Sequence, residues 1–226
     1  MDRLRAAASP AELPPPRPRA AARLVNVILD PLAAFRDIDA SPTWALAFVA
    51  LTALRFGSLF VFYRPEVSPL KLVAGVLFQV LTVAPAVVVL ALGLWAVAKF
   101  WRARLSWSSA LSVTVHALFA YTLATVLVAS IAGAVLPASV EVDLRNPPFT
   151  NLAFVAGAQT PAVMRRLLAA ADVRVAYAFV LAYLGVAAAS SAPGVPAGGR
   201  RRAAGAVATG VAVHVLATVG ATLARG

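Results

Sequence analysis

The sequence predicts an all-α protein, a polytopic transmembrane helix bundle with about five spans. Three observations predict this class. Of the 226 residues, 61% are hydrophobic and only 13% are charged, whereas soluble domains average roughly 45–50% apolar and about 25% charged residues. The mean hydropathy is +0.84. The apolar residues form long continuous runs, and these runs do not alternate in polarity as the strands of a membrane barrel do.

Five of these runs are long enough to cross a bilayer. A helix needs about 20 apolar residues to cross a hydrocarbon core roughly 30 Å thick. The runs are residues 43–62, 72–98, 110–136, 175–192 and 203–224. We expect them to form one transmembrane domain, residues 23–226. Residues 1–22, rich in Pro, Ala and Arg, are expected to be a disordered cytoplasmic tail.

A short amphipathic helix is predicted before the first span. Asp30 can act as its N-cap, with Pro31 at the first helical position. Leu32, Phe35 and Ile38 would then share one face. Such a face suits a helix that lies in the membrane interface, although an ordinary soluble linker is the alternative.

A second amphipathic helix is predicted in the long connection after the third span. Thr160 is its candidate N-cap, and Pro161 would occupy its first helical position. Its apolar face would consist of Val163, Met164, Leu167 and Leu168, with Arg165 and Arg166 opposite. We expect this helix to rest on the outer membrane surface or to cover the bundle.

The basic residues between the runs predict the orientation and the partners. One side carries twelve: Arg3, Arg5, Arg17, Arg19, Arg23, Arg36, Lys99, Arg102, Arg104, Arg200, Arg201 and Arg202, and the other side carries seven. Because the richer side stays in the cytoplasm, the N-terminus is expected inside and the C-terminus outside. This placement also explains the net charge of +11 by attraction to anionic lipid rather than by nucleic-acid binding. The expected partners are membrane lipids, with a membrane protein or a second copy of the chain as further candidates.

Three segments resemble the YIP family, membrane proteins named for interacting with Ypt/Rab GTPases, in its bacterial branch. They are LVNVILDPLAAFRDIDASPTW at residues 24–44, HALFAYTLATVL at 116–127 and RNPPFTNLAFV at 145–155. The family often has Gly-Tyr and then a Pro in the second segment, where this chain has Ala120, Tyr121 and Thr125. The eukaryotic Asp-Leu-Tyr-Gly-Pro signature is absent, so a Rab-dependent role does not carry over. The resemblance implies five spans with a cytoplasmic N-terminus in a bacterial inner membrane, and it supplies no catalytic residue.

Four polar residues inside the predicted spans are candidate functional contacts. Arg55 lies slightly past the middle of the first span, where a charge costs about 2.5–3.5 kcal/mol on insertion scales. It could contact an anion, or its stem could snorkel to the interface. Gln79 is expected at a helix–helix contact. His116 and His214 are expected to form interhelical hydrogen bonds, since no carboxylate within a span could complete a metal site with them.

Stripes of small residues are expected to hold the helices together, because close backbone approach drives association in lipid. In the fifth span, one stripe follows i, i+4 spacing through Ala206, Gly210 and His214. In the third span, a parallel stripe passes through His116 and Ala120, next to Tyr121. Each stripe should face protein rather than lipid.

These features favour a non-catalytic membrane protein, a scaffold or membrane-organising protein that acts through helix, lipid and protein contacts. The sequence has no cysteine, which excludes disulfides, thiolate catalysis and Cys-ligated zinc. No serine stands in a hydrolase motif, and we expect neither a metal nor a cofactor. A small-solute transporter or permease is the alternative, favoured by Arg55, by Gln79 and by a helix kink expected at Pro85.

Overall fold

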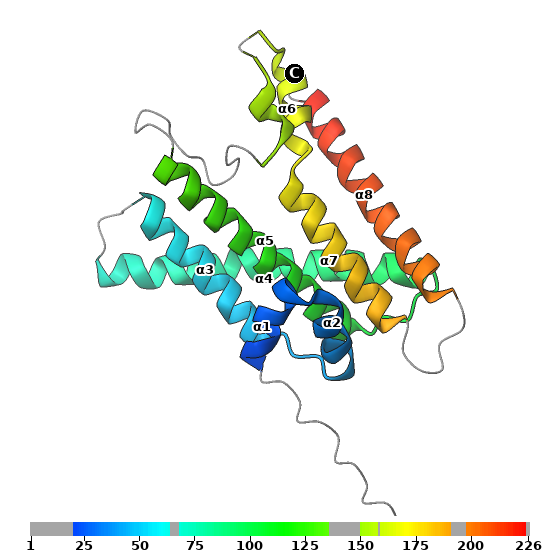
Figure 1. Ribbon diagram of the computed structural model, residues 1–226. Coiled ribbons are helices and arrows are strands. Elements are labelled where there is room, and N and C mark those ends of the chain that lie inside the picture. The colour runs from blue at the N-terminus through cyan, green and yellow to red at the C-terminus, as the bar shows by residue number, and fades with distance from the viewer. Residues whose placement is uncertain (1–19, 64–67, 136–149, 158, 191–197, 225–226) are drawn as a thin grey trace, which may run out of the picture.

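The computed structural model describes residues 20–63, 68–135, 150–157, 159–190 and 198–224, and these residues are almost entirely helical (Figure 1). The elements are α1 Ala20–Leu29, α2 Pro31–Ala40, α3 Ala45–Tyr63, α4 Pro69–Phe100, α5 Trp107–Val135, the 3₁₀ helix η1 Leu152–Val155, α6 Ala162–Ala170, α7 Val173–Ala189 and α8 Gly199–Leu223. Within these ranges the extended pairing is limited to an isolated bridge between Asn151 and Asp172. The predicted all-α class is therefore confirmed.

Three of the described helices, α4, α5 and α8, are long and apolar enough to cross a membrane. The other two predicted spans correspond to α3 and α7, which are apolar but shorter. At a rise of 1.5 Å per residue, the 17 residues of α7 extend about 26 Å, slightly less than the hydrocarbon core. The five predicted spans are thus present as five apolar helices, whereas five crossings are not confirmed.

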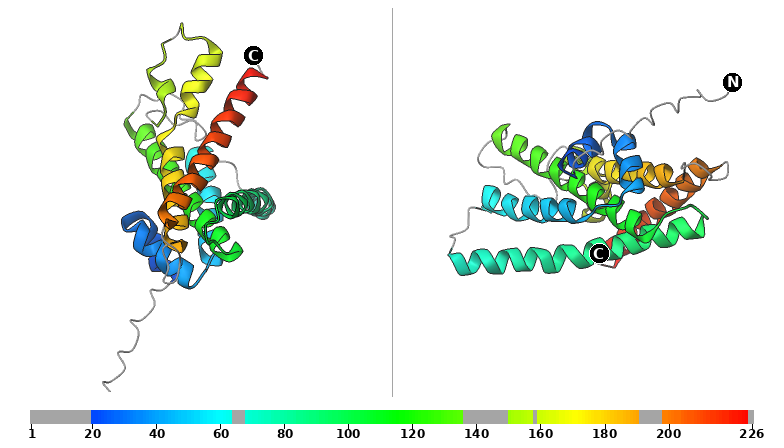
Figure 2. Two further views of the ribbon diagram at one scale, coloured as in Figure 1. Left: turned by 90° about the vertical axis from the view of Figure 1, so that its right-hand side faces the viewer. Right: turned by 90° about the horizontal axis from the view of Figure 1, so that it is seen from below.

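Helix α5 lies at the centre of the bundle. It packs against α3, α4 and α7, and its first half also contacts α1 and α2. Figure 2 shows α4 running along one side of the bundle while α1 and α2 lie on another. The buried residues of α5 are mostly small, for example Ala110, Ser112, Ala117 and Ala120, so the neighbouring backbones can approach α5 closely.

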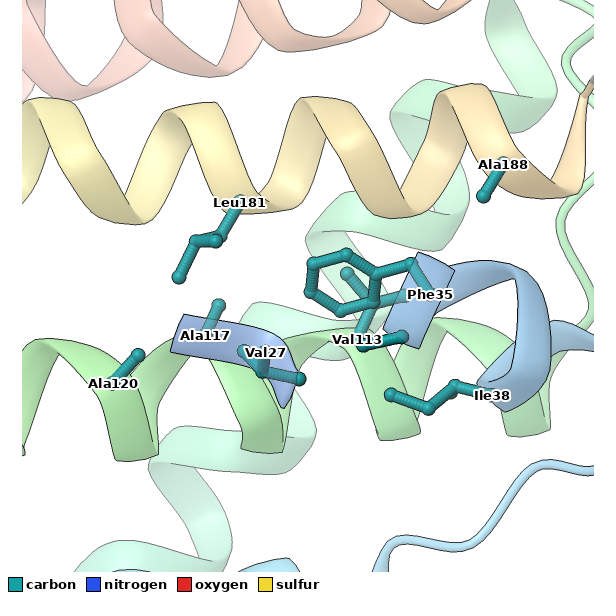
Figure 3. Packing of buried hydrophobic residues seen from close by; sticks show 9 residues of the cluster. Val27, Phe35, Ile38, Val113, Ala117, Ala120, Leu181 and Ala188 are labelled. Atoms are coloured by element: carbon teal, nitrogen blue, oxygen red, sulfur yellow. The ribbon is translucent and has the colours of Figure 1, made fainter. Parts of the chain in front are cut away.

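The short helix predicted at Pro31 is present as α2, and the Asp30 side chain accepts a hydrogen bond from the Ala33 amide at 3.2 Å. Its predicted apolar face is not left for the membrane interface, however. Phe35 and Ile38 are fully buried in a cluster with residues of α5 and α7 (Figure 3). The apolar face of α2 therefore packs against protein, because α5 and α7 leave room between them for these side chains.

Helix α1, directly before α2, was not predicted as an element. It includes the last residues of the predicted tail, Ala20 to Ala22, whereas residues 1–19 lie outside the described residues. Val27 packs into the same cluster as Phe35, and Arg23 is bonded to α2. Both contacts are tertiary, so the polar and apolar pattern of the segment alone did not predict the helix.

The predicted loop helix is α6, but it begins one residue later than expected. Pro161 occupies the N-cap position with extended backbone, and no side chain caps the helix; its carbonyl accepts the first bond from the Arg165 amide at 3.0 Å. The predicted cap at Thr160 is therefore wrong, since the non-helical ψ of Pro161 places the helix start at Ala162. Helix α6 packs on η1 and α8.

Helix α4 continues through Pro85 as one element of 32 residues. Thr82, one turn earlier, donates to the carbonyls of Phe78 and Gln79 at 2.9 and 3.1 Å. In Figure 2 the helix runs across the molecule as one continuous rod. Pro85 therefore does not divide this helix into two separate segments.

Several described helix ends gather at opposite ends of the bundle (Figure 1). At one end Arg202 in α8 donates to the carbonyl of Arg102 in the α4–α5 turn at 3.3 Å. At the same end Ser109 in α5 donates to Asp39 in α2 at 2.9 Å. The carboxyl ends of α5 and α8, with α6, lie at the other end (Figure 1). The basic-residue count assigned α2, the α4–α5 turn and the start of α8 to the same predicted side, and these described segments lie at the same end of the bundle.

Candidate functional site

A buried ion pair joins α5, α7 and the segment before η1. Asp172 and Arg174 are 8% and 4% exposed. The Arg174 Nε donates to both carboxylate oxygens of Asp172, at 3.0 and 3.1 Å, and its Nη2 donates to Oδ2. Asp172 also caps α7 by accepting from the Arg174 amide at 2.7 Å. Thr150 donates to the same carboxylate at 3.3 Å, so the charges of both side chains are satisfied within the bundle.

Helix α5 supplies the opposite wall of this site. The Arg174 Nη1 donates to Thr125 Oγ1 at 3.0 Å, and the guanidinium carbon lies 5.4 Å from the centroid of the Tyr121 ring. This distance is within the range of a cation–π interaction. Thr125 of α5 therefore bonds to Arg174 of α7.

An open groove of about 1050 Å³ lies between α7 and α8. Its walls are mainly apolar and include Ala176, Val180, Val207 and Val211. Asp172, with Thr150 and Asn151, contributes to one end of the groove, and Ala204 near the start of α8 contributes to the other. The groove follows the flank of the bundle, so it can accept an extended apolar chain.

A second buried ion pair fixes α1 to α2 at the opposite end of the bundle. Arg23 is 4% exposed, and its Nε donates to Asp37. Its Nη1 donates to the Ser41 carbonyl at 2.9 Å and to Thr43 Oγ1 at 2.6 Å. One guanidinium thus holds α1, α2 and the segment leading into α3 together.

Of the predicted polar contacts, Arg55 is exposed and Gln79 is buried. Arg55 is exposed on α3, and its carbonyl accepts from Ser58 at 2.8 Å. Gln79 is 7% exposed, and its Oε1 has no hydrogen-bond partner among the described residues. Arg55 therefore lies outside the buried ion-pair site. Gln79 of α4 has a buried acceptor oxygen without a hydrogen-bond partner among the described residues.

The two histidines are separated in the structure. His116 is buried in α5, and its Nδ1 lies 2.7 Å from the Ser112 carbonyl of the same helix. This bond is within one helix, in contrast to the interhelical bond expected for His116. His214 is half-buried and lines the groove. Its ring meets the Phe179 ring of α7 edge to face, with the centroids 5.8 Å apart.

The predicted packing residues lie largely toward protein. Ala120 and Ala206 are each 2% exposed. Gly210 faces α7, where an added Cβ would lie 3.5 Å from Phe179 Cε1. That distance is ordinary van der Waals contact, so Gly210 leaves room for alanine. Tyr121 is half-buried beside Arg174.

The sequence did not single out Asp172 and Arg174. Arg174 was counted among the basic residues outside the spans, and Asp172 received no role. The signal that could have found them is an Asp–x–Arg triplet directly before an apolar run. There an aspartate can cap the helix and pair with the arginine two residues later.

Comparison of the chain with protein-family models, with curated proteins and with solved structures finds no match.

Proposed function

We propose that this protein is a non-catalytic, multi-pass membrane protein that organises the membrane around it through lipid and protein contacts. In this proposal α3 and α7 cross the bilayer together with α4, α5 and α8. The resemblance to bacterial YIP proteins supports the same five-span arrangement. The observation that carries the proposal is the apolar groove between α7 and α8, because a surface of this kind binds acyl chains or apolar helices.

The internal ion pairs support a fixed bundle. Arg174 bonds α7 to α5, and Arg23 bonds α1 to α2. Ion pairs of this kind specify one arrangement of the helices more than they add stability. A fixed bundle suits a protein that presents a constant surface to its neighbours.

A small-solute transporter is the second candidate, and Gln79 favours it. Its unsatisfied Oε1 lies inside α4, six residues before Pro85. Uptake of labelled amino acids and sugars into proteoliposomes separates the two functions. We expect the same uptake with wild-type protein, with Gln79→Leu protein and with empty liposomes. Uptake that wild-type protein supports and Gln79→Leu abolishes would reject the scaffold.

The topology itself is testable with reporters fused to truncated chains. Fusions after residues 20, 105 and 198 should report cytoplasm, and fusions after residues 66 and 150 and at the C-terminus should report the outside. This expectation follows from the basic residues Lys99, Arg102 and Arg200 at one end of the bundle. An external signal after residue 198 would show that α7 does not cross.

A further inference from the structure

A group of basic side chains gathers where the α4–α5 turn meets the start of α8. We define this basic cluster as Lys99, Arg102, Arg104, Arg200, Arg201 and Arg202. The bond from Arg202 to the Arg102 carbonyl, and the bond of 3.0 Å from Trp101 Nε1 to Thr209 Oγ1, join the two segments. Among the described residues the salt bridges are Arg23–Asp37 and Arg174–Asp172. No described carboxylate therefore neutralises the basic cluster.

The basic cluster adjoins the end of the groove between α7 and α8. Ala204 and Val207 line the groove. Arg200 precedes them by four and seven residues, so all three side chains lie on one face of α8. Arg200 and its neighbour Arg201 are both exposed. The apolar groove therefore ends one helical turn from the exposed Arg200, at the N-terminus of α8, where the helix dipole also favours an anion.

We propose that this groove binds one anionic phospholipid, with an acyl chain between α7 and α8 and its phosphate at Arg200 and Arg201. This proposal rests on the membrane location in the proposed function and names the ligand of its surface. A phospholipid has the required order of chemistry, an apolar chain followed by an anionic group at the membrane surface. Arginine suits this role because its planar guanidinium donates two parallel hydrogen bonds to a phosphate.

Native mass spectrometry of the purified full-length protein tests the proposal. The protein is mixed in detergent with equal amounts of phosphatidylglycerol and phosphatidylcholine that carry identical acyl chains. We expect one phosphatidylglycerol to be retained about tenfold more than phosphatidylcholine, because the choline cation offsets the phosphate charge that the two arginines attract. The Arg200→Gln/Arg201→Gln variant should retain the two lipids equally.

The matched control is Arg36→Gln/Arg166→Gln, which removes the same charge from exposed arginines of α2 and α6. It should keep the wild-type preference. Ala204→Trp fills the groove from an exposed position, so it should lower the retention of both lipids. If Ala204→Trp does not fold, Val211→Trp tests the same groove.

Three results would overturn the lipid site: no preference in the wild type, an equal loss in the control variant, or a protein dimer that Ala204→Trp converts to monomers. The last result would make the groove an interface between copies of the chain. Each of these results leaves the scaffold proposal standing, whereas solute uptake rejects the scaffold whatever lipid is bound.

Discussion

Replacing Asp172 with alanine should lower the free energy of unfolding by about 3–5 kcal/mol, the range found when one partner of a buried ion pair is removed. Arg174, which is 4% exposed, would keep contacts only with Thr125 and the Tyr121 ring. A neutral hydroxyl and an aromatic face compensate a buried cation less well than a carboxylate does. Unfolding by SDS in mixed micelles, followed by circular dichroism, measures the change.

Two further variants separate the charge effect from the loss of the helix cap. Asp30→Ala removes a capping aspartate that forms no ion pair with the described residues, and it should lower the free energy of unfolding by about 1 kcal/mol. The double variant Asp172→Ala/Arg174→Met removes both charges, so it should recover most of the lost free energy of unfolding. The remaining loss should equal about that of the missing helix cap. A double variant no more stable than Asp172→Ala would show that the ion pair is not the cause.

The positions of the helices were predicted well because they depend on local properties of the chain. Every predicted span overlaps a described helix, since long apolar runs have few other structures available in lipid. The start of α2 was also predicted, because a capping Asp30 followed by Pro31 acts within one turn. The lengths of the helices were harder to predict. Helices α3 and α7 have 19 and 17 residues, near the lower limit for crossing a bilayer, so composition alone did not settle the number of crossings.

The contacts between helices could not be predicted to the same extent. The apolar face of α2 has the composition of an interfacial helix, and only the space between α5 and α7 shows that Phe35 is buried. Arg174 has the sequence context of a loop cation, and its role depends on Tyr121 and Thr125 about fifty residues earlier. Gly185 gives no signal at all, since a glycine in an apolar run can face lipid or protein. Each of these cases depends on which helix is the neighbour.

Gly185→Ala provides the sharpest test of the α5–α7 contact. A Cβ at this position would lie 2.5 and 2.6 Å from the two methyl carbons of Val113, closer than side chains pack. We therefore expect a loss of about 1–3 kcal/mol, the usual effect of overpacking. The same SDS unfolding experiment measures it.

Two companion variants show whether the loss comes from this one contact. Val113→Ala removes the opposing methyl groups, so the Gly185→Ala/Val113→Ala variant should be more stable than the sum of the single changes predicts, by about 0.5–3 kcal/mol. Gly93→Ala in α4, where nothing lies within 4 Å of the added Cβ, is the matched control. This change should leave the free energy of unfolding unchanged or raise it by up to about 1 kcal/mol, because alanine has a higher helix propensity than glycine. Strictly additive losses at Gly185 and Val113 would mean that α5 and α7 approach each other elsewhere.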